Sequence, residues 1–156
     1  MEEVKEIPMT DAIYDKAGRE YEVVTWTSGE NLNFKVRDRT TRVGHAYCHV
    51  RQTTLKVCDL HIENKCLRPA NFFVLWCIPL RWRETNYRNR GIGSALLELI
   101  ASHARKKGVT RIEGSIKPLD YEADSRLPQW YQDRGFNVVM EPAGSKIIAR
   151  LSLDLN

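Results

Sequence analysis

The chain has 156 residues and a formal net charge of +4; 42% of its residues are hydrophobic and 28% are charged. This length predicts a single compact domain over 1–156, and this composition excludes a disordered chain. The longest apolar run, 72–78, is too short to span a membrane, and the acidic start lacks the apolar core of a secretory signal. We therefore expect a soluble cytoplasmic protein.

The first half of the chain predicts strands. A hairpin is expected over 13–24, turning at 15–18, because Gly18 can adopt the positive φ of a bulged turn. Two further strands are expected at 31–38 and 43–50, since polar residues separate them.

Alternating residues over 55–63 predict another strand. One face would carry Leu55, Val57, Asp59, His61 and Glu63, and the other face would carry Lys56, Cys58, Leu60 and Ile62. The segment that follows is harder to interpret. We expect 65–86 to be an insertion, with 72–78 as a rival assignment for the buried strand.

The period changes after Gly91. Apolar residues recur with spacings of three and four, which is one face of a helix. The basic residues 105–107 suit the C-terminal turn of that helix, and Gly108 is a natural cap. The apolar positions are Ile92, Ala95, Leu96, Leu99, Ile100 and Ala104.

A short strand is expected over 110–116, followed by a second helix. Asp124 or Ser125 could cap this helix, which would run through Tyr131 and stop at Gly135. Two strands, at 136–140 and 146–153, would close the chain as a hairpin around 142–144.

The four cysteines are widely spaced, without a CxxC pair, and are expected to be reduced thiols or small buried side chains. His45 with His49, and Cys58 with His61, have spacings that could suggest a metal. Both pairs fall in predicted strands, where residues four apart are separated by about 13 Å and residues three apart point to opposite faces. We therefore expect no metal site.

Positive charge is concentrated in 81–111, which carries eight basic and two acidic residues, while the rest of the chain sums to −2. This stretch includes the turn Arg88–Ser94, whose two glycines open the predicted helix. Glycines allow close approach of a ligand, and the free N–H groups of a helix start bind anions. The segment therefore favours a small phosphorylated ligand, although a plain tight turn would also produce it.

Two known phosphate-binding motifs do not fit this turn. A dinucleotide fingerprint, GxGxxG, would have an acid about 20 residues on, as Glu113 is, but Leu96 replaces its third glycine and no strand leads directly into the turn. A Walker loop is excluded because no GK[ST] follows. Nucleic acid is not expected, because the basic stretch lacks the interleaved aromatics of a single-strand groove.

Two motifs carry a resemblance to a known family. The run RNRGIG fits the signature [RQ]-x-x-G-x-[GA] and continues as SALLELI; roughly 40 residues later, QWYQDRGFNVV resembles a FYxxxGFxV segment. In this order, the chain resembles the GNAT superfamily of acyl-CoA N-acyltransferases over 55–153. The resemblance implies an α+β fold, mixed and three-layer α/β/α-like, with a mostly antiparallel central sheet and two main helices.

The resemblance also implies acetyl-CoA as co-substrate. Amides of the glycine turn would bind its pyrophosphate, and pantetheine would lie between two splayed strands, using main-chain groups. The first of these strands is taken as 55–64, with Ile62 as a cofactor-binding residue. The cofactor-binding residues implied in the turn are Arg88, Asn89, Arg90, Gly91, Ile92, Gly93 and Ser94.

Catalytic roles follow from the same resemblance. Tyr131 matches a tyrosine that protonates the departing thiolate, and a phenol suits this role because its pKa of about 10 keeps it protonated at neutral pH. Asp59 or Glu63 could act as the base through a water; Glu113 is a weaker candidate. A packing tyrosine and a solvated strand face are the structural alternatives. At position 124 the family often has a cofactor-binding asparagine, whereas this chain has Asp124, to which we assign no cofactor contact.

The family places two helices between its first two strands, for which 29–32 leaves no room, so the amine acceptor stays open. The first hypothesis is an N-acetyltransferase that moves acetyl to a primary amine of a small molecule or protein by direct transfer in a ternary complex. The alternatives are a CoA-binding module of this fold without turnover, and a basic adaptor that binds nucleic acid through 81–111. A homodimer is left open.

Overall fold

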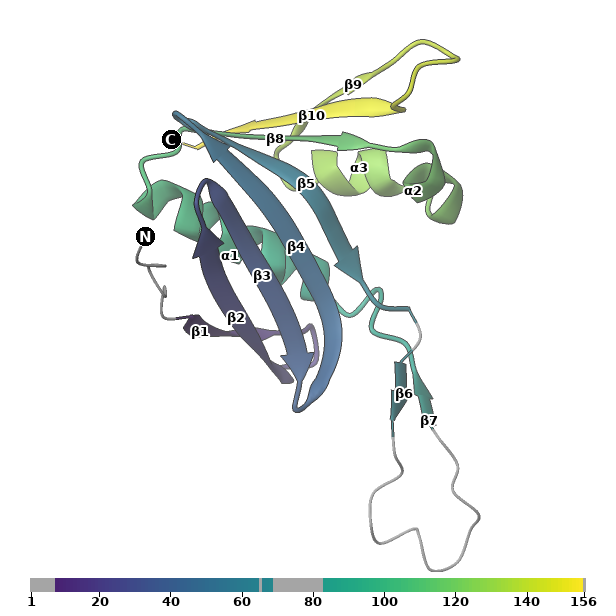
Figure 1. Cartoon of the computed structure of the whole chain (residues 1–156). Coiled ribbons are helices and arrows are strands. Elements are labelled where there is room, and N and C mark those ends of the chain that lie inside the picture. Colours follow the sequence, from purple (N-terminus) through teal and green to yellow (C-terminus); the bar gives the residue numbers. More distant parts are fainter. Residues whose placement is uncertain (1–7, 65, 69–82, 156) are drawn as a thin grey trace, which may run out of the picture. The chain divides into compact units, whose positions relative to one another are not determined.

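A computed structural model describes residues 8–64, 66–68 and 83–155. Eight strands form one sheet in the order β1-β2-β3-β4-β5-β8-β10-β9, and two short strands pair separately (Figure 1). The strands are β1 (Met9–Tyr14), β2 (Glu20–Ser28), β3 (Asn31–Asp38), β4 (Thr41–Arg51), β5 (Thr54–Ile62), β6 (Cys66–Arg68), β7 (Arg83–Thr85), β8 (Arg111–Ile116), β9 (Asn137–Met140) and β10 (Ala149–Asp154).

Three helices lie in the described part of the chain: α1 (Ile92–Lys106), α2 (Pro118–Ala123) and α3 (Leu127–Gln132). Helix α1 confirms the predicted apolar face, since Ile92, Leu96, Ile100 and Ala104 are at most 1% exposed. The pairs β1–β2, β8–β10, β9–β10 and β6–β7 are antiparallel, and β5 pairs with β8 in parallel. The predicted α+β class with a mostly antiparallel sheet is therefore confirmed.

Helix α2 was not expected from the sequence. It begins after Lys117 with a proline in its first turn, and the Lys117 N–H bonds to Asp120 Oδ2 at 3.4 Å. None of its residues is buried, so it leaves no apolar periodicity. The predicted cap was also wrong, because Asp124 ends α2 and Arg126 precedes α3. The Asp124 carboxylate instead accepts the Arg126 N–H at 3.0 Å.

The chain divides into two compact units. The first comprises Met1–Ser28, Asn33–Ala46 and Leu60–Leu99, and the second comprises Gly29–Leu32, Tyr47–Asp59 and Ile100–Asn156, within the described residues. The first unit has its own buried core, with Val23, Phe34, Val36, Tyr87 and Leu96 at 0% exposure.

The hairpin β1–β2 belongs to the first unit. Its register runs from Met9 opposite Thr25 to Tyr14 opposite Glu20. The turn is closed by a backbone bond from the Asp15 N–H to the Arg19 oxygen at 3.0 Å, and Gly18 has φ +78°. Since a positive φ costs glycine little, the sequence prediction of a glycine turn is confirmed.

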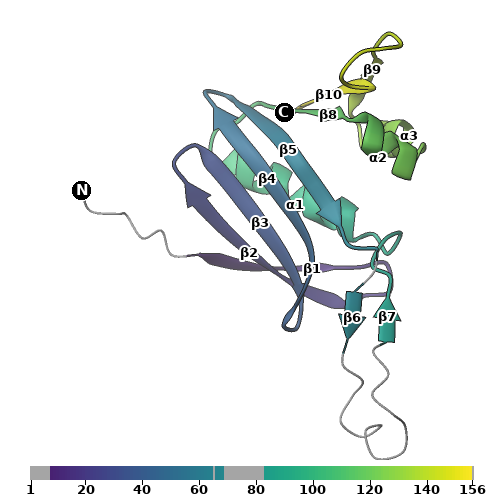
Figure 2. The same cartoon turned by 45° about the vertical axis from the view of Figure 1, so that its right-hand side comes forward.

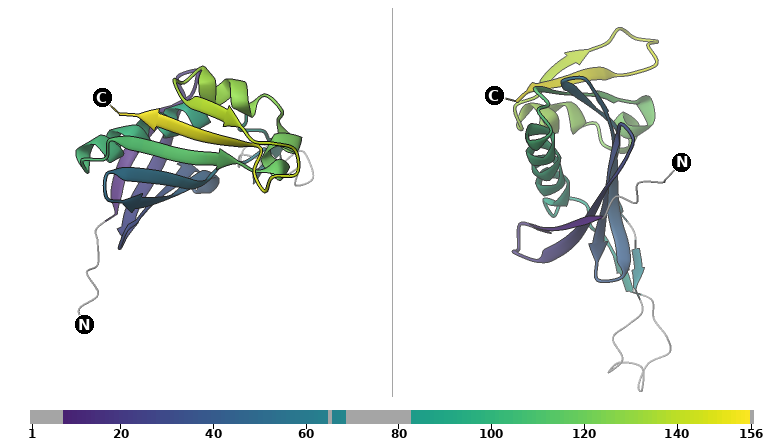
Figure 3. Two further views of the ribbon diagram at one scale, coloured as in Figure 1. Left: turned by 90° about the horizontal axis from the view of Figure 1, so that it is seen from above. Right: turned by 60° about the vertical axis from the view of Figure 1, so that its left-hand side comes forward.

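Strands β8, β10 and β9 lie side by side in the second unit (Figure 3). Leu151 of β10 faces Gly114 of β8 and Val138 of β9. The closing hairpin around Gly144, which has φ +87°, is as predicted. The core of this unit includes Leu55, Ile112 and Ala149, all at 0% exposure.

Strand β5 departs from the strict alternation predicted for it. Leu55 is buried and Lys56 exposed as expected, but Cys58 and Asp59 are both exposed, one after the other. The exposure of these residues therefore does not follow a strict alternation, and the assignment of Asp59 to the face of Leu55 and Val57 stays a prediction.

The expected absence of helices between the first strands agrees with the structure, where Gly29 and Glu30 alone separate β2 from β3. Within 65–86, β6 pairs with β7, and Cys66 faces Thr85 (Figure 2). The rival strand at 72–78 lies outside the described residues. Within the part of the chain that is described, no helix is long and apolar enough to cross a membrane.

Candidate functional site

The turn Arg88–Ser94 leads into α1. Asn89 has φ 62° and Gly91 has φ 90°, so the backbone turns twice through the left-handed region. The Ala95 N–H bonds to the Gly91 oxygen at 3.1 Å and begins the hydrogen-bond ladder of the helix. In general, the first N–H groups of a helix have no carbonyl acceptor within that helix. Since no acidic residue lies in the first turn, this end of α1 favours an anion.

Gly91 packs against the hairpin β1–β2. A Cβ at this position would lie 2.9 Å from Lys16 Cγ, and its φ of +90° is one that other residues rarely adopt. The Lys16 N–H donates to the Arg90 oxygen at 2.8 Å. The second predicted glycine, Gly93, lies within the first turn of α1.

Both predicted arginines are held by neighbouring protein groups. The Arg88 Nε donates to the Ile62 oxygen at 3.2 Å, and the Arg88 N–H donates to Asn86 Oδ1 at 2.8 Å. The Arg90 guanidinium carbon lies 5.3 Å from the centre of the Tyr87 ring. Arg88 therefore joins the turn to Ile62, a predicted cofactor-binding residue.

Strands β5 and β8 run parallel but pair over a short distance. In the described residues their register covers Thr54–Lys56 with Arg111–Glu113, although both strands continue beyond it. The binding of pantetheine between these two strands, expected from the resemblance, stays a prediction.

Tyr131 lies on α3 in the second unit and is half-buried. Its ring contacts Phe136 edge-to-face, with centroids 5.3 Å apart, and Trp130 at 4.8 Å. The pKa of Tyr131 is raised to about 12, chiefly by burial and also by the negative charges of Asp120 and Asp59, while Arg134 opposes the shift. The phenol therefore stays protonated at neutral pH, and the structure brings it within electrostatic range of Asp59.

Glu63 has a different environment, in the first unit. Its carboxylate lies 3.5 Å from His61 Nε2 and 3.9 Å from Arg42 Nη2. The His61 ring is 5.6 Å from that of His45. The weaker candidate, Glu113, accepts a hydrogen bond from Arg111 Nε at 3.0 Å. Two of the predicted carboxylates, Asp59 and Glu63, thus have separate neighbours, a phenol for one and an imidazole for the other.

Cysteine and metal chemistry add little to the described part of the chain. Cys48 and Cys58 are free thiols, as expected, and burial raises the pKa of Cys48 to about 12. Among the described residues, no three His, Cys, Asp or Glu side chains lie close enough to hold a metal ion.

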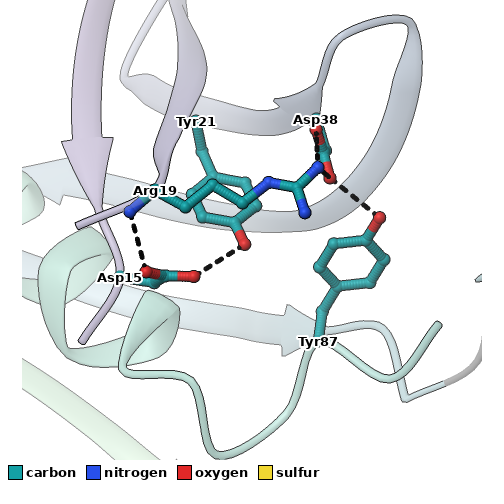
Figure 4. Close-up of polar contacts among 5 residues, drawn as sticks. All are labelled: Asp15, Arg19, Tyr21, Asp38 and Tyr87. Atoms are coloured by element: carbon teal, nitrogen blue, oxygen red, sulfur yellow. Dashed lines mark hydrogen bonds and ion pairs between the residues drawn. The ribbon is translucent and has the colours of Figure 1, made fainter. Parts of the chain in front are cut away.

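The sequence analysis did not identify the hydrogen-bonded pair Tyr87 and Asp38. Tyr87 is fully buried, and its hydroxyl donates to Asp38 Oδ2 at 2.9 Å, just before the turn (Figure 4). A single aromatic residue within the polar run 84–90 was the one signal of it in the sequence. Asp38 lies 49 residues away, at the end of a strand, and nothing local marks it.

Comparisons with known proteins agree with this geometry. A sequence model of the acetyltransferase (GNAT) family matches residues 2–136. Among solved structures, the GNAT domain of PAT from S. lividans aligns with a TM-score of 0.61 at 14% identity, covering 94% of this chain and 97% of that one. A search of curated proteins found no match.

Two more structures are similar at comparable levels. The ribosomal-protein-S18-alanine N-acetyltransferase from Escherichia coli has a TM-score of 0.57 at 15% identity, covering 83% of this chain and 72% of that one. The PaiA N-acetyltransferase from Thermoplasma acidophilum, solved with coenzyme A, has a TM-score of 0.53 at 14% identity, covering 80% of this chain and 61% of that one. These similarities show a shared fold.

Proposed function

Because the chain belongs to the acetyltransferase (GNAT) family, we propose that it transfers an acetyl group from acetyl-CoA to a primary amine. The observation that carries this proposal is the turn Arg88–Ser94, whose left-handed residues Asn89 and Gly91 lead directly into the first turn of α1. We further propose direct transfer in a ternary complex, within a single domain over 1–156 in which 65–86 is an insertion.

The residues of the turn fit the pyrophosphate of acetyl-CoA. Gly91 adopts a φ of +90° that other residues rarely adopt, and the start of a helix favours a bound anion. The solved relative from Thermoplasma acidophilum contains coenzyme A, which supports this assignment. When bound, acetyl-CoA supplies the activated thioester.

The acyl end of the ligand would follow the opening between β5 and β8. This placement is supported by the short register of the two strands, which pairs Thr54–Lys56 with Arg111–Glu113. Arg88 keeps the end of β5 next to the turn by donating to the Ile62 oxygen. This contact supports Ile62 as a residue beside the ligand.

Proton removal from the amine is assigned to Asp59. An alkylamine has a pKa of about 10 and must lose a proton before it attacks the thioester. Asp59 is exposed and can accept that proton through a water, while its charge reaches Tyr131. Glu63 is the competing candidate, since His61 lies 3.5 Å from its carboxylate.

Tyr131 is assigned as the acid that protonates the departing thiolate. A phenol with a pKa of about 12 donates to a thiolate only when that thiolate is itself poorly solvated. The burial that raises the pKa of Tyr131 would act in the same direction on a thiolate bound beside it.

The decisive experiment measures release of free CoA from acetyl-CoA with a panel of primary amines, alongside a thermal shift with acetyl-CoA. Stabilisation together with amine-dependent release supports the proposal, whereas stabilisation without release indicates a CoA-binding module. No stabilisation would contradict the assignment of the turn and favour a basic adaptor. Asp59→Asn and Glu63→Gln then identify the base, since the correct one should lower kcat about 10²–10⁴-fold.

A further inference from the structure

A buried carboxylate, that of Asp38, is hydrogen-bonded to Tyr87, the residue that precedes the turn Arg88–Ser94. Asp38 is 3% exposed, and Arg19 Nη2 donates to both of its oxygens, at 2.9 and 2.7 Å. The Tyr87 hydroxyl adds a third hydrogen bond, at 2.9 Å. A buried carboxylate is tolerated when it is paired and hydrogen-bonded, and these two donor groups supply three hydrogen bonds to Asp38 inside the first unit.

A second carboxylate is bonded in parallel. Asp15 accepts the Tyr21 hydroxyl at 2.9 Å and the N–H groups of Ala17 and Arg19, each at 2.9 Å (Figure 4). Desolvation alone would raise the pKa of Asp15, but these hydrogen bonds and the charge of Arg90 lower it. Asp15 is therefore an ionised acceptor that fixes the turn of the hairpin β1–β2.

These two carboxylates and their donors form one cluster that contacts the turn Arg88–Ser94. Tyr21 and Tyr87 pack edge-to-face, with ring centroids 6.2 Å apart, and Arg90 lies over the Tyr87 ring at 5.3 Å. The backbone adds a hydrogen bond from Lys16 N–H to the Arg90 oxygen at 2.8 Å. The cluster thus holds the turn on both sides of Arg88.

The turn needs such support because of its own conformation. Asn89 has φ 62°, a region that a residue other than glycine occupies at an energetic cost. Residues in such conformations persist when the surrounding structure fixes them, and they gather at ligand-binding sites.

We propose that Tyr87 is a positioning residue, which, through Asp38 and Arg19, pre-organises the turn Arg88–Ser94 for a pyrophosphate-containing ligand. This inference rests on the proposed function for the identity of the ligand. Arg90 then acts as a support for the turn, because two arginines, Arg19 and Arg90, balance the charges of Asp15 and Asp38. The backbone amides of the turn, rather than the Arg90 side chain, would then make the main contacts with phosphate.

The test compares Tyr87→Phe with the parent in the full chain. The variant keeps the ring under Arg90 and loses the hydrogen bond to Asp38. We expect amide hydrogen exchange of residues 89–93, measured without ligand, to become at least fivefold faster, and the calorimetric Kd for CoA to rise five- to tenfold. Arg19→Lys, which keeps the charge but loses the two-oxygen contact, should change both in the same direction.

A variant matched for lost stability separates positioning from general weakening. Ile112→Val removes one buried methyl group in the second unit and should leave both measurements unchanged. Exchange and Kd within twofold of the parent in Tyr87→Phe would overturn the inference. Faster exchange of the turn in a protein that binds no CoA would instead uphold the positioning role and contradict the proposed function.

Discussion

The cofactor turn and the surroundings of Tyr131 are built in different ways. The turn is formed by the main chain, with two left-handed residues, a helix start and a backbone bond from Lys16 to Arg90, and buried side chains around Tyr87 support it. Tyr131 depends on side chains, namely two aromatic contacts and the charges of Asp120, Asp59 and Arg134. This difference implies that ligand binding and proton transfer can be impaired separately, because few groups serve both.

Tyr131→Phe should give the largest effect and is the most direct way to test this separation. We expect kcat to fall about 10²–10⁴-fold because general acid catalysis is lost, while CoA affinity stays within twofold. Steady-state kinetics on one acceptor, with calorimetry for CoA, measure the two quantities. A kcat within threefold of the parent would remove Tyr131 from the mechanism.

Alkaline titration should show the second largest effect. The folded pKa of Tyr131, about 12, lies above its ordinary value of 10.0, so the proton is held more tightly in the folded protein. The associated stability is complete below pH 10 and is lost as the pH rises toward 12. Urea unfolding should show a loss on the order of 2 kcal/mol from this group, which is absent in Tyr131→Phe.

Cys48 contributes a separate part of that alkaline loss. Its pKa rises from 9.0 to about 12, chiefly through burial, so its contribution begins to disappear near pH 9. Cys48→Ala serves as the control that removes this part alone. If Tyr131→Phe and the parent lose the same stability above pH 10, the burial of the phenol is not maintained in solution.

Gly91→Val should impair ligand binding selectively. A Cβ here would meet Lys16 Cγ at 2.9 Å and would strain a φ of +90°, so the turn must move. We expect the Kd for CoA to rise at least tenfold, or about 1.4 kcal/mol. Gly144→Val is the matched control, since Gly144 has φ +87° with no atom within 4 Å of a Cβ. An equal loss of affinity in both variants would contradict the placement of the ligand.

The smallest effect is expected at the far end of α1. Arg105 and Lys106 lie about 20 Å from the turn at 1.5 Å per residue, and both are exposed. The double variant Arg105→Ala with Lys106→Ala should keep CoA affinity within twofold. Arg88→Ala should weaken it several-fold, since Arg88 joins the turn to Ile62. Equal losses in the two proteins would show that net charge, rather than the turn, binds CoA.

Much of the fold could be predicted from local signals. Gly18, Gly108 and Gly144 all have positive φ at the predicted turns, and the spacing of apolar residues located α1. Helix α2 could not be predicted in this way, because none of its residues is buried. The family resemblance is confirmed by the match over residues 2–136.

The candidate site was predictable where it depends on the backbone. The run from Arg88 to Ser94 marks a glycine turn and a helix start within a few residues. The bond between Tyr87 and Asp38 joins residues 49 apart, and no pattern in the sequence connects them. The exposed pair Cys58 and Asp59 interrupts an alternation that the sequence shows as regular, because exposure depends on which other elements cover each face of the strand.

The tight links between the early strands also bear on how the chain folds. Strands β1 to β5 are successive neighbours in the sheet, and Gly29 and Glu30 are the whole connection between β2 and β3. Closing such short loops costs little chain entropy, so these pairings can form early. The Tyr87–Asp38 bond and the parallel pairing of Thr54 with Arg111 close much longer segments. We therefore expect strands β1 to β5 to fold first. The Tyr87–Asp38 hydrogen bond that supports the turn Arg88–Ser94 should form late in folding.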